Sequence, residues 1–229
     1  TKNARGRRTQ LERMEKLDKP EFATVPTFRF EPVSLPVPSA LVVKDLEVGY
    51  YYPLLPKLNL NIAGGQKVVI TGFNGIGKST LMKTLVGQLP ALGGEYHFAD
   101  AVRIGYFSQD LVWEFPQFTP LQVMADAYPR FNEKQLRRAL AQCGIKAAHI
   151  RQPVGTLSGG EQATGNLCLL LLSKPNFLML DEITNHLDAE TKAVLQKELA
   201  AFGGSLLLVT HEESFYRDFA DKVLAVGEG

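Results

Sequence analysis

A glycine-rich segment that follows a short apolar run constrains this chain more than any other feature. Residues 72–80 have the sequence GFNGIGKST and match the pattern G-x-x-x-x-G-K-[ST]. Residues 68–71 before it are typical of a buried strand, and residues 78–88 after it have helical apolar spacing. A glycine-rich turn between a strand and a helix directs backbone N–H groups at phosphate oxygens. The sequence therefore predicts a nucleoside triphosphate site.

Each predicted contact in this segment has a chemical reason. Lys78 is expected to reach the outer phosphates, and the Ser79 hydroxyl is expected to hold Mg²⁺. The glycines allow the backbone to approach the phosphates closely. The predicted nucleotide contacts are Gly72, Asn74, Gly75, Gly77, Lys78, Ser79 and Thr80.

Two carboxylates follow a second apolar run. Residues 177–180 are typical of a buried strand, which ends at Asp181 and Glu182. Ligands of α/β sheets bind at the carboxyl ends of the strands. Asp181 is suited to contact the nucleotide's Mg²⁺, and Glu182 is suited to polarise the attacking water.

The order of apolar runs predicts an α/β domain with a largely parallel sheet covered by helices, and the early strands as an antiparallel edge. The length of 229 residues allows one such domain and an appendage. The predicted strands are 41–50, 58–62, 68–71, 102–107, 177–180, 205–209 and 222–226. The predicted helices are 78–88, 133–143, 159–173, 189–202 and 213–219.

The first 40 residues have a different composition from the rest. In residues 2–19, seven basic residues stand against three acidic ones, and Leu11, Met14 and Leu17 recur at three-residue steps. This pattern predicts a basic helix that ends before Pro20, although an ordinary solvated helix fits the charges equally well. Four prolines after Val25 favour an extended connector. The predicted segments are a basic linker helix (1–22), a connector (23–40) and an ATP-binding domain (41–229).

Composition excludes other classes of protein. The net charge of +1 gives no overall field for nucleic acid or membrane, so only the basic N-terminal segment indicates RNA. Cys143 and Cys168 have no metal-like spacing, which favours a reducing, cytoplasmic compartment. No apolar run approaches the roughly 20 residues of a membrane span. The start without Met suggests part of a longer chain.

Residues 157–162 have the sequence LSGGEQ at the start of a predicted helix. This helix N-terminus predicts a second anion site, and a simple capped helix start is the alternative. LSGGEQ is the signature sequence of the ABC ATPase superfamily, and the order of motifs over residues 41–229 resembles that family. The resemblance implies a P-loop NTPase fold of the ABC type, with a helical subdomain at about residues 112–173. It also implies Mg²⁺-dependent binding and hydrolysis of ATP.

The resemblance implies further roles, residue by residue. Tyr50 matches the aromatic residue that stacks on adenine, and Tyr51 and Tyr52 leave that choice open. Gln109 matches the glutamine that contacts Mg²⁺ and the attacking water, so the implied metal contacts are Ser79, Gln109 and Asp181. His211 matches the histidine that touches the γ-phosphate.

In this family the signature of one domain closes over the ATP of another. The residues implied to act on a partner's ATP are Ser158, Gly159, Gly160, Glu161 and Gln162. Residues 185–188 match the D-loop, which crosses the interface between the two domains. The implied partner is a second ABC domain in the same full-length chain, and the isolated domain is expected to be a weak ATPase.

Several details resemble the ABC-F branch more than a transporter subunit. Gln109 follows Lys78 by only 31 residues. The sequences IGYFSQ (104–109) and TNHLD (184–188) resemble those of ABC-F proteins. Residues 5–20 resemble the end of the charged interdomain linker, which implies contact with ribosomal RNA and tRNA in translation or antibiotic resistance. The alternative is a transporter subunit that docks through residues 112–147.

A third possibility is a degenerate domain that only binds ATP, and the presence of Glu182 and His211 argues against it. The chain nevertheless departs from the family pattern. Ile183 stands where proline is usual, and Gly165 and Asn166 stand where valine and a basic residue are usual. Glycine inside a helix costs about 1 kcal/mol relative to alanine. These departures question the coupling of the signature helix to the D-loop.

Overall fold

The computed structural model describes residues 25–72, 75–108 and 110–227, without the side chains of residues 75 and 76. The linker helix predicted for residues 1–22 and the predicted contacts Asn74 and Gln109 lie outside these residues. The strands are β1 (Leu41–Glu47), β2 (Leu58–Ile62), β3 (Lys67–Thr71), β4 (Gly93–Phe98), β5 (Ile104–Phe107), β6 (Phe177–Asp181), β7 (Ser205–Val209) and β8 (Lys222–Ala225). The helices are α2 (Gly75–Leu85), α3 (Pro120–Ala127), α4 (Glu133–Gln142), η1 (Val154–Thr156), α5 (Gly159–Leu172), η2 (Ile183–Asn185), α6 (Ala189–Ala201) and α7 (Glu213–Tyr216).

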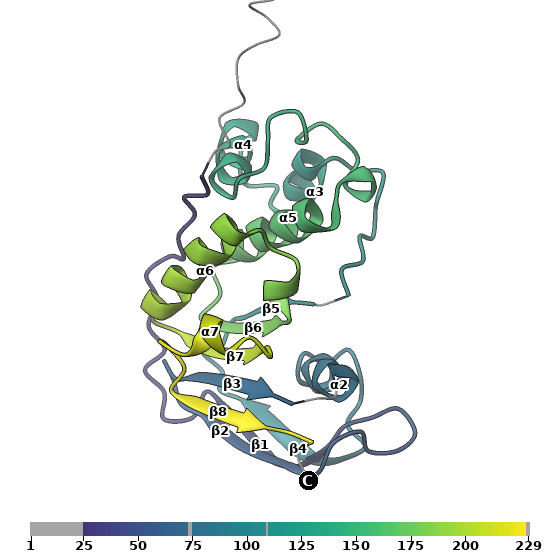
Figure 1. The fold of residues 1–229 in the computed structure, drawn as a ribbon, viewed down its shortest axis with the longest axis vertical. Coiled ribbons are helices and arrows are strands. Elements are labelled where there is room, and N and C mark those ends of the chain that lie inside the picture. The colour runs from purple at the N-terminus through teal and green to yellow at the C-terminus, as the bar shows by residue number, and fades with distance from the viewer. Residues whose placement is uncertain (1–24, 73–74, 109, 228–229) are drawn as a thin grey trace, which may run out of the picture.

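Two sheets form the body of the domain (Figure 1). One has five parallel strands in the order β5-β6-β7-β3-β8, and the other has three antiparallel strands in the order β2-β1-β4. The predicted α/β class is therefore confirmed. The antiparallel strands form a sheet of their own instead of extending the parallel one.

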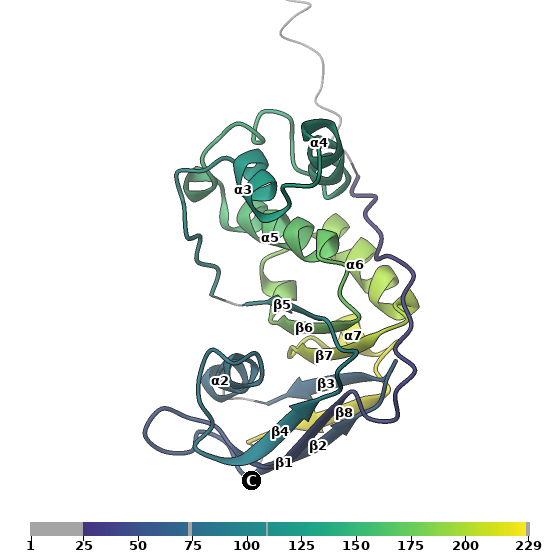
Figure 2. The same ribbon diagram turned by 180° about the vertical axis from the view of Figure 1, so that it is seen from behind.

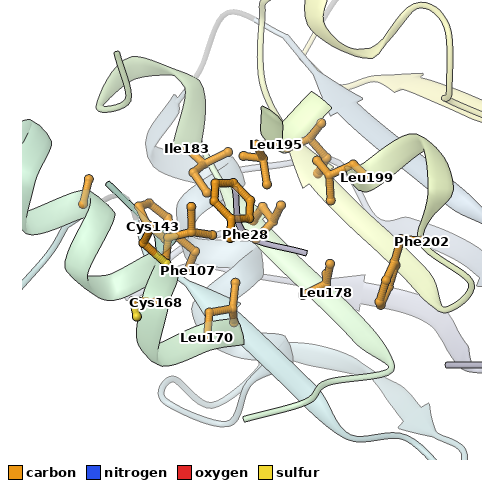
Figure 3. Close-up of a cluster of buried hydrophobic side chains, with 14 of the residues drawn as sticks. Phe28, Phe107, Cys143, Cys168, Leu170, Leu178, Ile183, Leu195, Leu199 and Phe202 are labelled. Carbon is orange, nitrogen blue, oxygen red and sulfur yellow. The ribbon is translucent and has the colours of Figure 1, made fainter. Parts of the chain in front are cut away.

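The inner strand β6 is buried on both faces, as expected for a covered parallel sheet. Because side chains alternate along a strand, Phe177 and Met179 join a core with the antiparallel sheet and α2, whereas Leu178 and Leu180 join a second core under α5 and α6. Figure 3 shows Leu178 in this second core. The two cores hold the sheets and the helices together.

Three helices, α3, α4 and α5, gather at the end of the molecule away from the antiparallel sheet (Figures 1 and 2). Capping boxes fix the starts of α3 and α4, with Thr119 bonded to Gln122 and Asn132 bonded to Gln135. No helix in the described part of the chain is both long and apolar enough to cross a bilayer.

Residues 25–40 contain no helix or strand and pack along the domain (Figure 2). The Thr27 amide donates to the Gln142 carbonyl at the end of α4 (2.8 Å). Phe28 is buried in the second core, and the Phe30 ring lies 5.2 Å from that of Phe202, after α6. This segment therefore contacts both the helical end and the body of the domain.

Candidate nucleotide-binding site

The parallel sheet brings the separately predicted motifs to one edge. β3, β6 and β7 are neighbours and run in the same direction, so their carboxyl ends lie side by side. Gly72 follows β3, Asp181 ends β6, and His211 follows β7 by two residues. Segments far apart in sequence thus meet at the edge where ligands bind in such folds.

The phosphate loop requires glycine at its first position. Gly72 has φ 141°, and a Cβ there would lie 2.0 Å from the Val226 carbonyl oxygen. Lys78 is buried in α2, and its ammonium donates a hydrogen bond to the Gly72 carbonyl. A buried cation of this kind gains from an anionic neighbour, which a nucleotide phosphate would supply. Ser79 and Thr80, which follow in the same helix, are also buried.

Asp181 is a buried carboxylate without a well-formed hydrogen bond in the described part of the chain. Burial raises its pKa to about 6; the nearby Ser79 hydroxyl lowers the pKa, and the Glu182 charge raises it. The Asp181 carboxylate and the Ser79 hydroxyl are together suitable ligands for Mg²⁺. Mg²⁺ usually keeps few protein ligands and takes the others from substrate phosphates and water, so phosphate oxygens would complete the coordination. No cluster of three or more His, Cys, Asp or Glu side chains suited to a metal occurs among the described residues.

Glu182 has a backbone conformation that is unusual for a residue other than glycine. Its φ of 52° and ψ of 36° lie in the left-handed region, and its amide donates to the Val209 carbonyl at 2.9 Å. Its Oε2 lies 3.4 Å from both His211 Nδ1 and Asn185 Nδ2. The Glu182 side chain is 7% exposed and that of His211 is 67% exposed. The buried Glu182 carboxylate thus lies next to an imidazole on the solvent side of the site, where the two groups could orient a water molecule.

The loop with the three tyrosines lies against the start of α2. A Cβ at Gly77 would meet Leu55 Cδ2 at 2.7 Å, which places this loop beside the phosphate loop. Tyr50, Tyr51 and Tyr52 are all exposed, by 54%, 95% and 68%. Adenine stacking by Tyr50 stays a prediction, with the other two rings as alternatives.

The signature turn is fixed by its own capping box. The Ser158 hydroxyl accepts from the Glu161 amide (3.2 Å), and Glu161 Oε2 accepts from the Ser158 amide (3.3 Å). Glu161 also lies 3.1 Å from His149 Nδ1. A Cβ at Gly159 would meet nothing within 4 Å, so the turn is open on that side.

The signature turn has neighbours in the helical end and in residues 185–188. A Cβ at Gly160 would lie 3.2 Å from the His186 carbonyl oxygen, and Trp113 Nε1 donates to Gln162 Oε1 at 2.9 Å. Trp113 and His149 were not among the site residues predicted from the sequence. The presence of one tryptophan, four residues after Gln109, is a signal that could have drawn attention to the first.

The phosphate loop, the carboxylates at the end of β6 and the mixed architecture together define a P-loop nucleotide-binding domain. The family model described as ABC transporter matches residues 55–185, which is more than half of the chain. The chain therefore belongs to the ABC transporter family, as an ATP-binding domain.

Known proteins resemble the chain over most of its length. It is 39% identical to the ABC transporter ATP-binding protein YfmM of Bacillus subtilis over 95% of this chain and 42% of that protein. It is 36% identical to the Escherichia coli K12 protein YheS, described as a probable ATP-binding protein, over 98% of this chain and 36% of that protein. The chain thus spans less than half the length of these relatives.

Solved structures share the fold. A dimeric ATP-binding cassette in a post-hydrolysis state with ADP and Pi superimposes with a TM-score of 0.67 at 22% identity, over 81% of this chain and 94% of that one. The cbiO1 protein of Clostridium perfringens, part of the transporter complex cbiONQ, gives 0.62 at 25% identity over 82% and 84%. These matches agree with the ABC-type fold.

Proposed function

We propose that this chain is one half of an ATP-hydrolysing pair of domains in an ABC-F type protein that acts on the ribosome. The buried Glu182, beside Asp181 and within 3.4 Å of His211, is the observation that carries the catalytic part of this proposal. A domain that only bound ATP would not need a carboxylate held in a strained conformation at the end of β6.

The residues divide the reaction among them. Lys78 and the amides of the phosphate loop bind the β- and γ-phosphates, and Ser79, Asp181 and Gln109 would hold Mg²⁺. Bound Mg²⁺ would neutralise phosphate charge. Glu182 orients a water molecule and accepts its proton as the water oxygen attacks the γ-phosphorus. The bond to the bridging oxygen breaks and ADP leaves, while His211 contacts the transferred γ-phosphoryl group.

A second domain completes the site. The turn at Ser158 and Gly159 is exposed, and its contacts lie away from the phosphate loop of its own chain. Phosphoryl transfer needs charge stabilisation on every side of the γ-phosphate. We infer that this turn acts on the ATP of a second ABC domain, whose own signature covers the ATP held by Lys78. The greater length of YfmM and YheS leaves room for that domain in one chain.

The proposed ribosomal role is supported by the basic N-terminal segment and by the ABC-F wording of residues 104–109 and 184–188. The Lys and Arg side chains of that segment would neutralise RNA phosphates next to bound tRNA. Translation or resistance to ribosome-binding antibiotics is the process in which such a protein would act.

A transporter subunit is the second candidate, and one surface feature favours it. Val112 is 85% exposed beside a cavity of about 260 Å³ whose lining includes Phe115, Phe118 and Asn166. An apolar cavity on the helical end would suit a helix of a membrane partner. The related cbiO1 protein belongs to a transporter complex.

One experiment separates these candidates. Glu182→Gln in the full-length protein is expected to keep ATP binding, stop hydrolysis and hold the closed state. Cells that express it are then fractionated, with Glu95→Gln, an exposed position on β4, as the matched control. Enrichment of the Glu182→Gln protein with ribosomes supports the proposal, whereas enrichment with membranes supports the transporter.

A further inference from the structure

Trp113 connects the segment after Gln109 to the signature turn. Its Nε1 donates to Gln162 Oε1 at 2.9 Å, and Gln162 Nε2 donates to the Leu157 carbonyl at 2.9 Å. The side-chain amide of Gln162 thus hydrogen-bonds both the Trp113 indole and the carbonyl of Leu157. Both bonds fit a single orientation of the Gln162 amide, because its oxygen accepts and its nitrogen donates.

Gly165 makes room for the indole on the same helix. A Cβ at this position would lie 3.7 Å from Trp113 Cη2, which is ordinary van der Waals contact. Any longer side chain would compete with the ring for space. The space between the indole and α5, lined also by Leu140 and Leu157, is only about 10 Å³ and has no room for a ligand. Gly165, where the chain departs from the family pattern, is therefore the position against which the Trp113 ring packs.

We propose that Trp113 is a positioning residue, which holds residues 157–162 in the orientation that meets the nucleotide of the second ABC domain. This role rests on the function proposed above. The hydrogen bonds fix the Leu157 carbonyl, and the ring fixes the first turns of α5 from the side. Ser158 and Gly159 are exposed at the start of that helix, where backbone N–H groups bind phosphate.

A purely structural role for Trp113 makes a different prediction. If the ring only filled space in the helical end, its loss would lower thermal stability and leave ATP-driven closure unchanged. If it positions the signature turn, removal of its N–H donor also weakens closure, beyond the small loss of stability that one missing hydrogen bond causes. The two roles therefore separate when the N–H group is removed and the ring is kept.

The test uses the full-length protein with Glu182→Gln, in which ATP-driven closure is followed by energy transfer between dyes on the two ABC domains. Trp113→Phe keeps an aromatic ring at position 113 and removes the N–H donor. We expect it to raise the ATP concentration for half-closure about fivefold, the usual effect of one hydrogen bond. Val112→Ala, at the exposed neighbouring position, is the matched control and should cause no shift. The melting temperature without nucleotide should fall by only a few degrees in Trp113→Phe and stay unchanged in Val112→Ala.

A second pair of variants tests the contact between the Trp113 ring and Gly165. Gly165→Ala adds a Cβ that the structure accommodates, so closure should not change. Gly165→Leu displaces the indole and should shift half-closure by at least as much as Trp113→Phe. Equal behaviour of the alanine and leucine variants, or a Trp113→Phe protein with lower stability but unchanged closure, overturns the positioning role. A parent protein that never closes with ATP contradicts the proposed function itself, and this role with it.

Discussion

Glu182 Oε2 lies 3.4 Å from His211 Nδ1, although the first side chain is buried and the second is mostly exposed. The two residues follow neighbouring parallel strands, β6 and β7, and the Glu182 amide is bonded to the Val209 carbonyl. The sheet fixes both backbones, so the fold itself places the carboxylate and the imidazole next to each other.

His211→Ala is expected to lower ATP hydrolysis by the full-length protein about 10²-fold, because a positioned side chain at the reacting phosphate supplies that much in similar reactions. The free energy of unfolding should change by less than about 0.5 kcal/mol, since the side chain is exposed. His97→Ala on β4 is the matched control. Steady-state kinetics measure the effect, and equal rates for the two variants would argue against a role for His211.

Asp181→Asn should show separately how the buried carboxylate affects stability without nucleotide and how it contributes to binding of Mg²⁺ and ATP. Without nucleotide at pH 8, where the carboxylate is ionised despite its raised pKa, the variant should be more stable by about 1 kcal/mol, because it lacks a charge that burial disfavours. The added stability from Mg²⁺ and ATP should shrink, since binding and stability are linked.

Thermal unfolding with and without Mg²⁺ and ATP measures both effects, and Asp100→Asn is an exposed control. A variant that gained the full stabilisation from Mg²⁺ and ATP would contradict the assignment of Asp181 to the metal.

Phe28→Ala should destabilise the domain by about 3–5 kcal/mol, because it leaves a cavity in the second core. Val25→Ala, at a position that is 61% exposed, should change stability by less than about 0.5 kcal/mol. Hydrogen exchange of the β6 amides in the full-length protein reports the difference. A small effect of Phe28→Ala would mean that residues 25–40 act as a connector and not as part of the core.

Neutral replacements of Arg5, Arg7, Arg8 and Arg13 should weaken RNA binding by the full-length protein. Each lost phosphate contact should reduce the slope of log affinity against log salt by about 0.7–0.9. Ribosome binding at several salt concentrations measures this slope, with Lys44 and Lys222 replaced in the control. An unchanged slope would mean that the basic segment does not contact RNA.

The fold class could be predicted because each core strand carries its own signal. Residues 177–180 and 205–209 are continuous apolar runs, as strands buried on both faces must be. β4 was not predicted, because it begins with two glycines, which are poor strand formers, and its polar–aromatic alternation covers only residues 95–98. Pairing with β1 makes it a strand, and that partner is about 50 residues away.

The residues of the site were predictable where a motif is local. Residues 72–80 and 157–162 have fixed spacing, whereas the contact of Trp113 with Gln162 joins positions 49 residues apart. Ile183, which departs from the family pattern, is fully buried in the second core, which also contains Leu195 and Leu199 (Figure 3). That packing depends on the tertiary structure, so the sequence alone could not explain the substitution.

The central claim is that Glu182 activates the water that attacks ATP, and the hydrolysis rate of the full-length protein with Glu182→Gln tests it most directly. The account predicts that kcat falls by about 10²–10⁴-fold relative to the wild type, with an affinity for ATP within about threefold. A Glu182→Gln protein that hydrolyses ATP at the wild-type rate would contradict it.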